Sequence, residues 1–125
     1  MGKARIESVF IGGGLLFLLI GMVFGMWMGA HEDFQLSDAH AHLNLIGFVI
    51  PTLYGLVHRG FPGMAASRLA WPQLFAHFLG VLIMIPGIVI VIRTGHPAFA
   101  IAGGLVIILA TLLFAFVFAT ADKSR

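Results

Sequence analysis

The stretch DAHAHLNLIGFVIPTLYGLV, residues 38–57, places His40 and His42 at the start of an apolar run of membrane-spanning length. An α-helix rises about 1.5 Å per residue, so about 20 apolar residues cross the ~30 Å hydrocarbon core of a bilayer. Burying an ionisable side chain in such a run is costly, so the two imidazoles are candidates for a functional site. The stretch therefore predicts a transmembrane helix with a candidate site near its first end.

The composition of the whole chain agrees with a membrane protein. Of its 125 residues, 60% are hydrophobic and 10% are charged, whereas about a quarter are charged in soluble domains. With the opening stretch, the segments of spanning length are residues 6–29, 38–57, 71–92 and 98–120. We therefore predict an all-α integral membrane protein, in which residues 1–125 form a single domain of four transmembrane helices.

The charged residues lie mostly at the chain ends and in the predicted loops, so the net charge of +2 indicates topology and not a nucleic-acid surface. The basic residues before the first span, in the second loop and in the tail are Lys3, Arg5, Arg59, Arg68, Lys123 and Arg125. The first loop, residues 31–38, is acidic and has no Lys or Arg. The positive-inside rule then places both termini in the cytoplasm and the first and third loops outside.

The spacing of the histidine pair decides what it can bind. Two residues of an α-helix turn about 200°, so the rings of His40 and His42 point to nearly opposite sides. They cannot chelate one ion from one helix, but each can meet a partner from another helix. Ser37 or Asp38 is a good N-cap, and the nearby positive end of the helix favours neutral imidazole, the metal-binding form. The alternative is that both rings lie at the outer interface without a ligand.

The remaining histidines have simpler interpretations. His31 and His96 are expected as exposed loop residues at the outer face, and His58 as an inner-interface residue. His77 lies about two turns into the third span, where a hydrogen-bonded buried histidine is the simpler interpretation. By residue count it lies about 12 Å from His42 along the membrane normal, so we do not expect the two to share a ligand shell. The absence of cysteine excludes disulfides, thiolate metal sites and iron–sulfur clusters.

Arginine, glycine and proline add further signals. Arg93 closes the third span level with the pair, either as an interfacial side chain or as counter-ion to an anionic group at the outer face. The small-xxx-small ladder of the first span, typical of helices that pack closely in lipid, consists of Gly21, Gly25 and Gly29. It is compatible with packing inside one chain or between subunits. Pro51 and Pro86 lie within spans, where each frees a carbonyl one turn earlier.

DAHAHLNLIGFV together with TLYGLVHR resembles subunit I of the haem–copper oxidases and short bacterial membrane proteins related to it. That subunit has twelve spans in three pseudo-symmetric units of four, and this chain is similar to one unit. In the second span of the last unit, a His-x-His pair ligates two haems on opposite sides of the helix, and His40 and His42 match it in spacing, position and direction. Arginines that pair with haem propionates in the family have their equivalent here in Arg93. The family's copper ligands do not carry over well, because His77 lies near the inner end.

The resemblance implies a homotrimer that reproduces twelve spans. His40 of one chain and His42 of the next would bind a six-coordinate haem b suited to electron transfer, and Arg93 would hold a propionate. It further implies a bacterial inner (cytoplasmic) membrane protein, in contact with lipid, with a quinone or a cytochrome as redox partner. We expect no nucleic-acid partner and no enzymatic activity of the chain by itself, any redox activity being that of the haem.

Three other interpretations stay open. Copper or zinc could be bound at the outer face by His40 and His42, with His96, His77 and Asp38 as weaker candidate ligands. A five-coordinate haem with one of the two histidines would suit sensing or handling of nitric oxide or oxygen. The chain could also be a structural membrane subunit without a cofactor.

Overall fold

The structure, a computed structural model, describes residues 5–123, and these form helices joined by short loops and turns. The helical segments are α1 (Ile6–Ala30), α2 (Ser37–His42), η1 (Leu43–Val49), α3 (Ile50–Gly60), η2 (Pro62–Ala66), α4 (Ala70–Thr94) and α5 (Ala98–Thr120). Since α2, η1 and α3 run on as one rod, residues 5–123 contain four helices long and apolar enough to cross a membrane. The all-α, multi-pass prediction is thereby confirmed. Lys3 and Arg125, which entered the topology prediction, lie outside the described residues.

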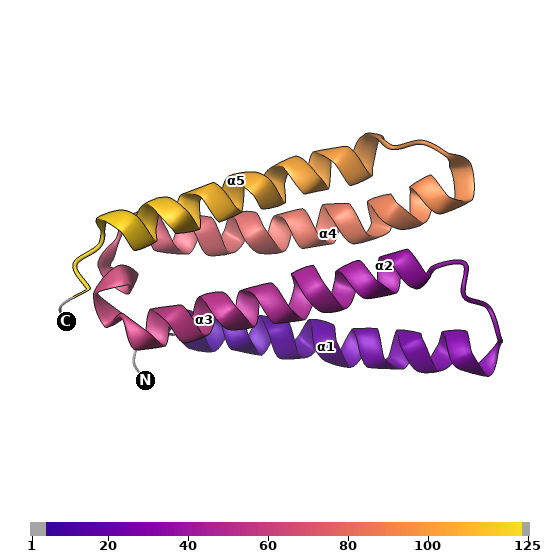
Figure 1. Ribbon diagram of the computed structural model, residues 1–125, viewed down its shortest axis with the longest axis horizontal. Helices are drawn as coiled ribbons and strands as arrows, with labels where there is room; N and C mark the ends of the chain where they lie inside the picture. Colours follow the sequence, from indigo (N-terminus) through magenta and orange to yellow (C-terminus); the bar gives the residue numbers. More distant parts are fainter. Residues whose placement is uncertain (1–4, 124–125) are drawn as a thin grey trace.

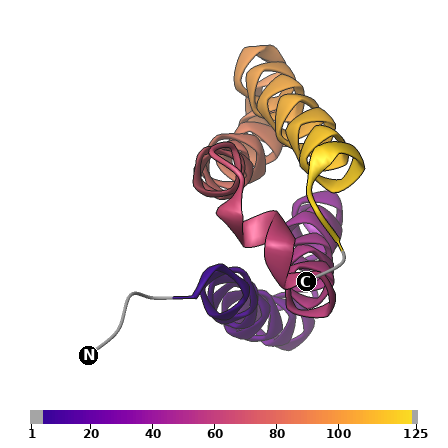
Figure 2. The same ribbon diagram turned by 90° about the vertical axis from the view of Figure 1, so that its left-hand side faces the viewer.

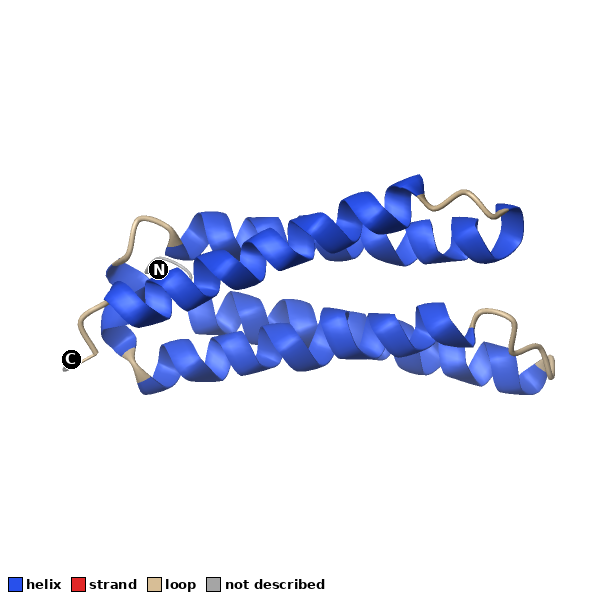
Figure 3. Ribbon diagram, turned by 45° about the horizontal axis from the view of Figure 1, so that its top comes forward, coloured by secondary structure: helices blue, strands red, loops and turns tan. Residues whose placement is uncertain are grey.

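The helices are arranged as two hairpins that lie along each other (Figure 1). The first hairpin pairs α1 with the rod of α2, η1 and α3, and the second pairs α4 with α5. Viewed along the bundle from the end that holds the termini, each hairpin is seen as two adjacent helices (Figure 2). Helix accounts for nearly the whole length of the bundle, with loops confined to its two ends (Figure 3). His40 and His42 therefore lie near the end opposite to the termini.

Backbone contact holds the second hairpin together. A Cβ added to Gly103 on α5 would lie 2.5 Å from the backbone nitrogen of Met84 on α4. Likewise, a Cβ added to Gly87 would lie 2.5 Å from the backbone nitrogen of Ala100. At these points no side chain fits, so α4 and α5 approach as closely as small-residue helix pairs do in lipid.

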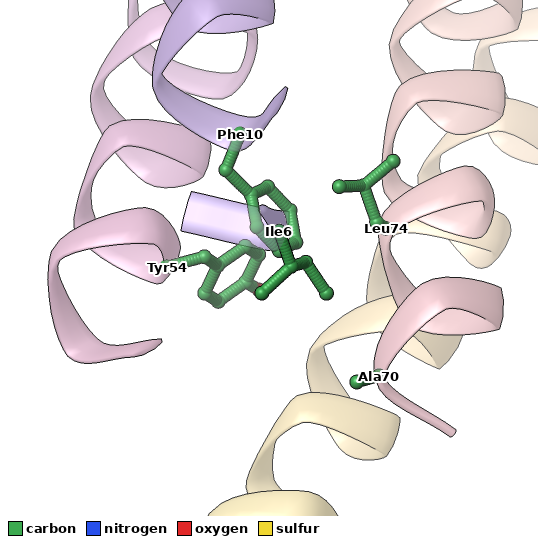
Figure 4. Close-up of a cluster of buried hydrophobic side chains, with 5 residues drawn as sticks. All are labelled: Ile6, Phe10, Tyr54, Ala70 and Leu74. Carbon is green, nitrogen blue, oxygen red and sulfur yellow. The ribbon is translucent and has the colours of Figure 1, made fainter. Parts of the chain in front are cut away.

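The two hairpins are joined by buried side chains near the end with the termini. Figure 4 shows this cluster, which consists of Ile6, Phe10, Tyr54, Ala70 and Leu74 from α1, α3 and α4. Away from such clusters, large apolar side chains point outward; Val23 and Met26 of α1 are 69% and 77% exposed. An outer surface of this kind suits hydrocarbon and not water.

The second spanning rod is not a plain α-helix. Across η1 the backbone is π-helical, and the N–H of Ile50 donates to the carbonyl of Leu45, five residues earlier. In this register the carbonyl of Ile46 faces Pro51, which has no N–H to donate. The Nε2–H of His77 on α4 donates to that carbonyl instead, at 2.8 Å. The carbonyl freed by a proline, as the sequence predicts, is therefore satisfied by a buried histidine from another helix.

Candidate functional site

His40 is directed toward α1 within its own chain. Its ring meets Phe24 edge-on, with ring centroids 5.8 Å apart. A Cβ added to Gly25 would lie 2.9 Å from the Cε1 atom of His40, so the absence of a side chain at Gly25 leaves room for the imidazole. One turn away, a Cβ added to Gly21 would collide with the Oδ1 atom of Asn44. These two rungs of the glycine ladder thus accommodate polar side chains of the same chain.

The third rung of the ladder behaves differently. No atom of residues 5–123 lies within 4 Å of a Cβ added to Gly29. Packing inside one chain is therefore confirmed for Gly21 and Gly25, while Gly29 has room for a larger side chain. Gly25 and Gly21 therefore leave room for the imidazole of His40 and the amide of Asn44 between the two helices.

His40 and Asn44 satisfy each other only in part. The Nδ2–H of Asn44 donates to Nε2 of His40 at 3.1 Å, so the ring hydrogen of His40 is carried by Nδ1. That Nδ1–H and the Oδ1 of Asn44 are buried, and neither has a hydrogen-bond partner in the described part of the chain. Leaving a buried donor or acceptor unmatched costs about 1–3 kcal/mol. The pair thus retains one donor and one acceptor that a polar ligand can engage.

His42 has the geometry of a metal-binding histidine. Its Nδ1–H donates to the backbone carbonyl of Asp38 at 2.8 Å, which fixes the tautomer and leaves a lone pair on Nε2. Ala39 belongs to a buried cluster against which Ile88 and Val89 of α4 pack. At about 100° per residue, His42 lies roughly 60° from Ala39, on the side away from His40. The α-helical backbone over Ser37–His42 therefore turns the two rings to different sides of the rod, as the sequence predicts.

The other predicted outer-face residues are not gathered around the pair. Arg93 is exposed in the last turn of α4, and His96 is exposed in the following loop, where its backbone N–H donates to Oγ1 of Thr94. Within residues 5–123, no three His, Asp or Glu side chains are close enough to hold a metal ion. A copper or zinc site would therefore need ligands from more than one copy of the chain.

His77 is a structural residue of the bundle core. It is fully buried, its Nε2–H caps the carbonyl of Ile46, and its ring meets Tyr54 edge-on at 5.3 Å. The interpretation as a hydrogen-bonded buried histidine is therefore confirmed. The predicted helix start is confirmed, since α2 begins at Ser37. The predicted cap is wrong, because the N-cap position is Leu36, which has no side-chain cap hydrogen bond, and Ser37 and Asp38 lie within the helix.

His77→Phe is expected to destabilise the protein by about 1–2 kcal/mol. Phenylalanine keeps a ring of similar size but leaves the buried carbonyl of Ile46 without a donor. Thermal unfolding of the detergent-solubilised protein, followed by circular dichroism, measures the effect. His96→Phe is the matched control, because His96 is exposed and its side chain can change without loss. Equal unfolding midpoints for the two variants would contradict the capping role.

No protein-family model, no curated protein and no solved structure matches the chain. The resemblance to the haem–copper oxidases therefore rests on the motif within residues 38–59 and stays a prediction.

Two polar groups were not anticipated from the sequence. Asn44 lies four residues after His40, a spacing that brings side chains together on one helix face, so a signal was present. Glu7 is buried near the start of α1, where its carboxylate accepts from Nε of Arg5 at 2.8 Å. The signal in the sequence for this second polar group was an acidic residue inside a predicted membrane span.

Proposed function

We propose that the protein binds haem b in the membrane and transfers electrons, with His42 as an axial ligand. The observation that carries this proposal is the Nδ1–H···O=C hydrogen bond of His42, because metal-ligating histidines usually hold their second ring nitrogen in this way. The bond places a ring hydrogen on Nδ1 and directs Nε2 away from its own backbone. A haem held between two imidazoles supplies one-electron chemistry with little room for oxygen.

The second ligand is His40 of a neighbouring copy. In its own chain His40 is held by one hydrogen bond from Asn44, which is worth about 1 kcal/mol net. Exchanging that bond for an iron ligand costs little by itself, and the ring also gives up its edge contact with Phe24 and its packing on Gly25. Once His40 turns away from α1 of its own chain, the two rings are available to different neighbours, which favours a ring of copies; three would make twelve spans.

The remaining parts of the proposal follow from position. Arg93 is exposed at the same end of the bundle as the pair and is assigned to a haem propionate. The apolar outer surface of α1 is available to lipid and to neighbouring copies. The termini and the second loop carry most of the basic residues, which supports their placement on the cytoplasmic side of the membrane. The proposed membrane is the bacterial inner membrane. A quinone or a cytochrome is the proposed redox partner.

The test is the absorption spectrum of protein purified from haem-replete cells, oxidised and dithionite-reduced, with metal analysis and molar mass from light scattering. Haem b with two imidazoles gives a Soret band and a sharp reduced α-band that carbon monoxide does not change. A spectrum that shifts with carbon monoxide would favour the five-coordinate gas-binding alternative. Copper or zinc without haem would favour the metal-site alternative, and neither haem nor metal would refute both.

His40→Ala is expected to convert the six-coordinate haem into a five-coordinate one. The variant keeps His42 and so retains haem, but its reduced spectrum shifts when carbon monoxide is added. His96→Ala, which removes an exposed outer-face imidazole, leaves the spectrum unchanged and serves as the control. If His40→Ala protein shows the wild-type spectrum with and without carbon monoxide, His40 is not the second ligand.

A further inference from the structure

A pocket with several charged lining residues lies at the other end of the bundle. At that end α1 begins and α5 ends (Figure 1). The pocket has a volume of about 190 Å³ and is formed by the start of α1, the end of α3, η2 and the start of α4. Among its lining residues are Arg5, Glu7, His58, Arg59 and Trp71. Small-molecule pockets measure about 300 Å³ or more, so this one suits a head-group-sized moiety and not a large cofactor.

His58 is the most buried polar group that lines the pocket. It is 1% exposed, and within residues 5–123 neither ring nitrogen has a hydrogen-bond partner. Its ring stacks on Phe10 at 5.7 Å and meets Phe114 edge-on at 5.7 Å. A buried imidazole held between aromatic rings, with its donor and its acceptor both unmatched, is an unfavourable arrangement unless a ligand engages it.

The charges around the pocket favour an anion. The carboxylate of Glu7 is already paired with Arg5, and Arg59 adds a second, exposed guanidinium. Counting these three groups leaves an excess of one positive charge. Helix α1 also begins here without a side-chain cap; the N–H of Ser8 donates to the carbonyl of Arg5, and those of Ile6 and Glu7 have no acceptor within the helix. The positive end of a 25-residue helix thus adds to the same field.

We propose that this pocket binds a phosphate-bearing anion, namely the head group of an acidic phospholipid. Arg59 pairs with the phosphate oxygens, the N-terminal amides of α1 face the same charge, and the imidazole of His58 donates its N–H. The pocket lies where helices of membrane-spanning length end, which is the level of lipid head groups. Free phosphate offers the same chemistry, and the experiment separates the two sources. The proposal does not depend on haem binding at the opposite end.

Trp71 supplies an optical signal at the site. The chain has two tryptophans, so Trp27→Phe leaves Trp71 as the reporter. The protein in nonionic detergent is titrated with phosphatidylglycerol, with phosphatidylcholine and with inorganic phosphate. We expect a saturable change in Trp71 emission with phosphatidylglycerol and a much weaker one with phosphatidylcholine, whose choline cancels the phosphate charge. Inorganic phosphate that reproduces the change, and displaces the lipid, would identify free phosphate as the source of the anion.

Two variants test the residues. Arg59→Gln is expected to weaken the apparent affinity about tenfold, the loss of one charge-assisted hydrogen bond. Arg68→Gln removes the same charge from an exposed position in the same connection, outside the residues that line the pocket, and should leave affinity unchanged. His58→Phe keeps the ring between its aromatic neighbours and is expected to weaken binding several-fold, at unchanged helix content by circular dichroism. Equal losses for both arginines, or equal binding of the two lipids, would overturn the proposal.

Discussion

The proposed haem ligation predicts that purified His42→Ala protein lacks a Soret band, or binds haem at least about a hundredfold more weakly than the wild type. The substitution removes the Nε2 lone pair that is assigned to the iron, and even second-layer partners of metal ligands are worth ten- to a hundredfold in affinity. Haem is titrated into protein made without it, and the Soret absorbance is followed. The helix is retained, since alanine is the best helix former.

The control for His42→Ala is a second histidine with the same local geometry. The Nδ1 of His31 also donates to the backbone carbonyl four residues earlier, that of Trp27, at 2.9 Å. His31 is exposed beyond the end of α1, so His31→Ala should bind haem as the wild type does. Haem retained by His42→Ala, or lost equally by both variants, would show that His42 does not hold the iron.

Gly103→Leu is expected to destabilise the second hairpin by about 3 kcal/mol or more, enough to prevent recovery of folded protein. The added Cβ would lie 2.5 Å from a backbone nitrogen of α4, and backbone atoms cannot move aside as a flexible side chain can. Detergent-solubilised yield and the thermal unfolding midpoint are the measurements.

The adjacent glycine provides the comparison. In the described residues no atom lies within 4 Å of a Cβ added to Gly104, so Gly104→Leu should unfold at or near the wild-type midpoint. Both variants add the same apolar volume at neighbouring positions of α5. If they are equally stable, the close approach of α4 and α5 at Gly103 is not what holds the hairpin.

The spans were predictable because their signal is local. Apolar runs bounded by charged or turn-forming residues mark a helix by themselves, and the predicted span 98–120 coincides with α5. The π-helical turn was not predictable, because it depends on a contact between His77 and Ile46, 31 residues apart in the sequence. A proline within a span predicts a backbone carbonyl without its helical hydrogen bond, but it does not predict which side chain will donate to that carbonyl.

The candidate site was predictable in the same limited sense. Helix periodicity sets the angle between His40 and His42, since it needs only the rise and turn of the backbone. Which ring packs inside the chain depends on where α1 lies, and only the structure places Gly25 against His40. The pocket at His58 was not predictable for the same reason, because it is formed by residues from the start of α1 and residues from the end of α3.

The π-helical segment also affects how many residues the rod holds. One residue of α-helix corresponds to about 100° of rotation. A π-helical turn holds one residue more than an α-helical turn, so a sequence shorter by one residue within 43–49 could run through as ordinary α-helix while His40 and His42 kept nearly the same orientation relative to Tyr54. The π-helical turn therefore lets the rod carry one additional residue, and present the carbonyl of Ile46 to His77, without rebuilding the bundle.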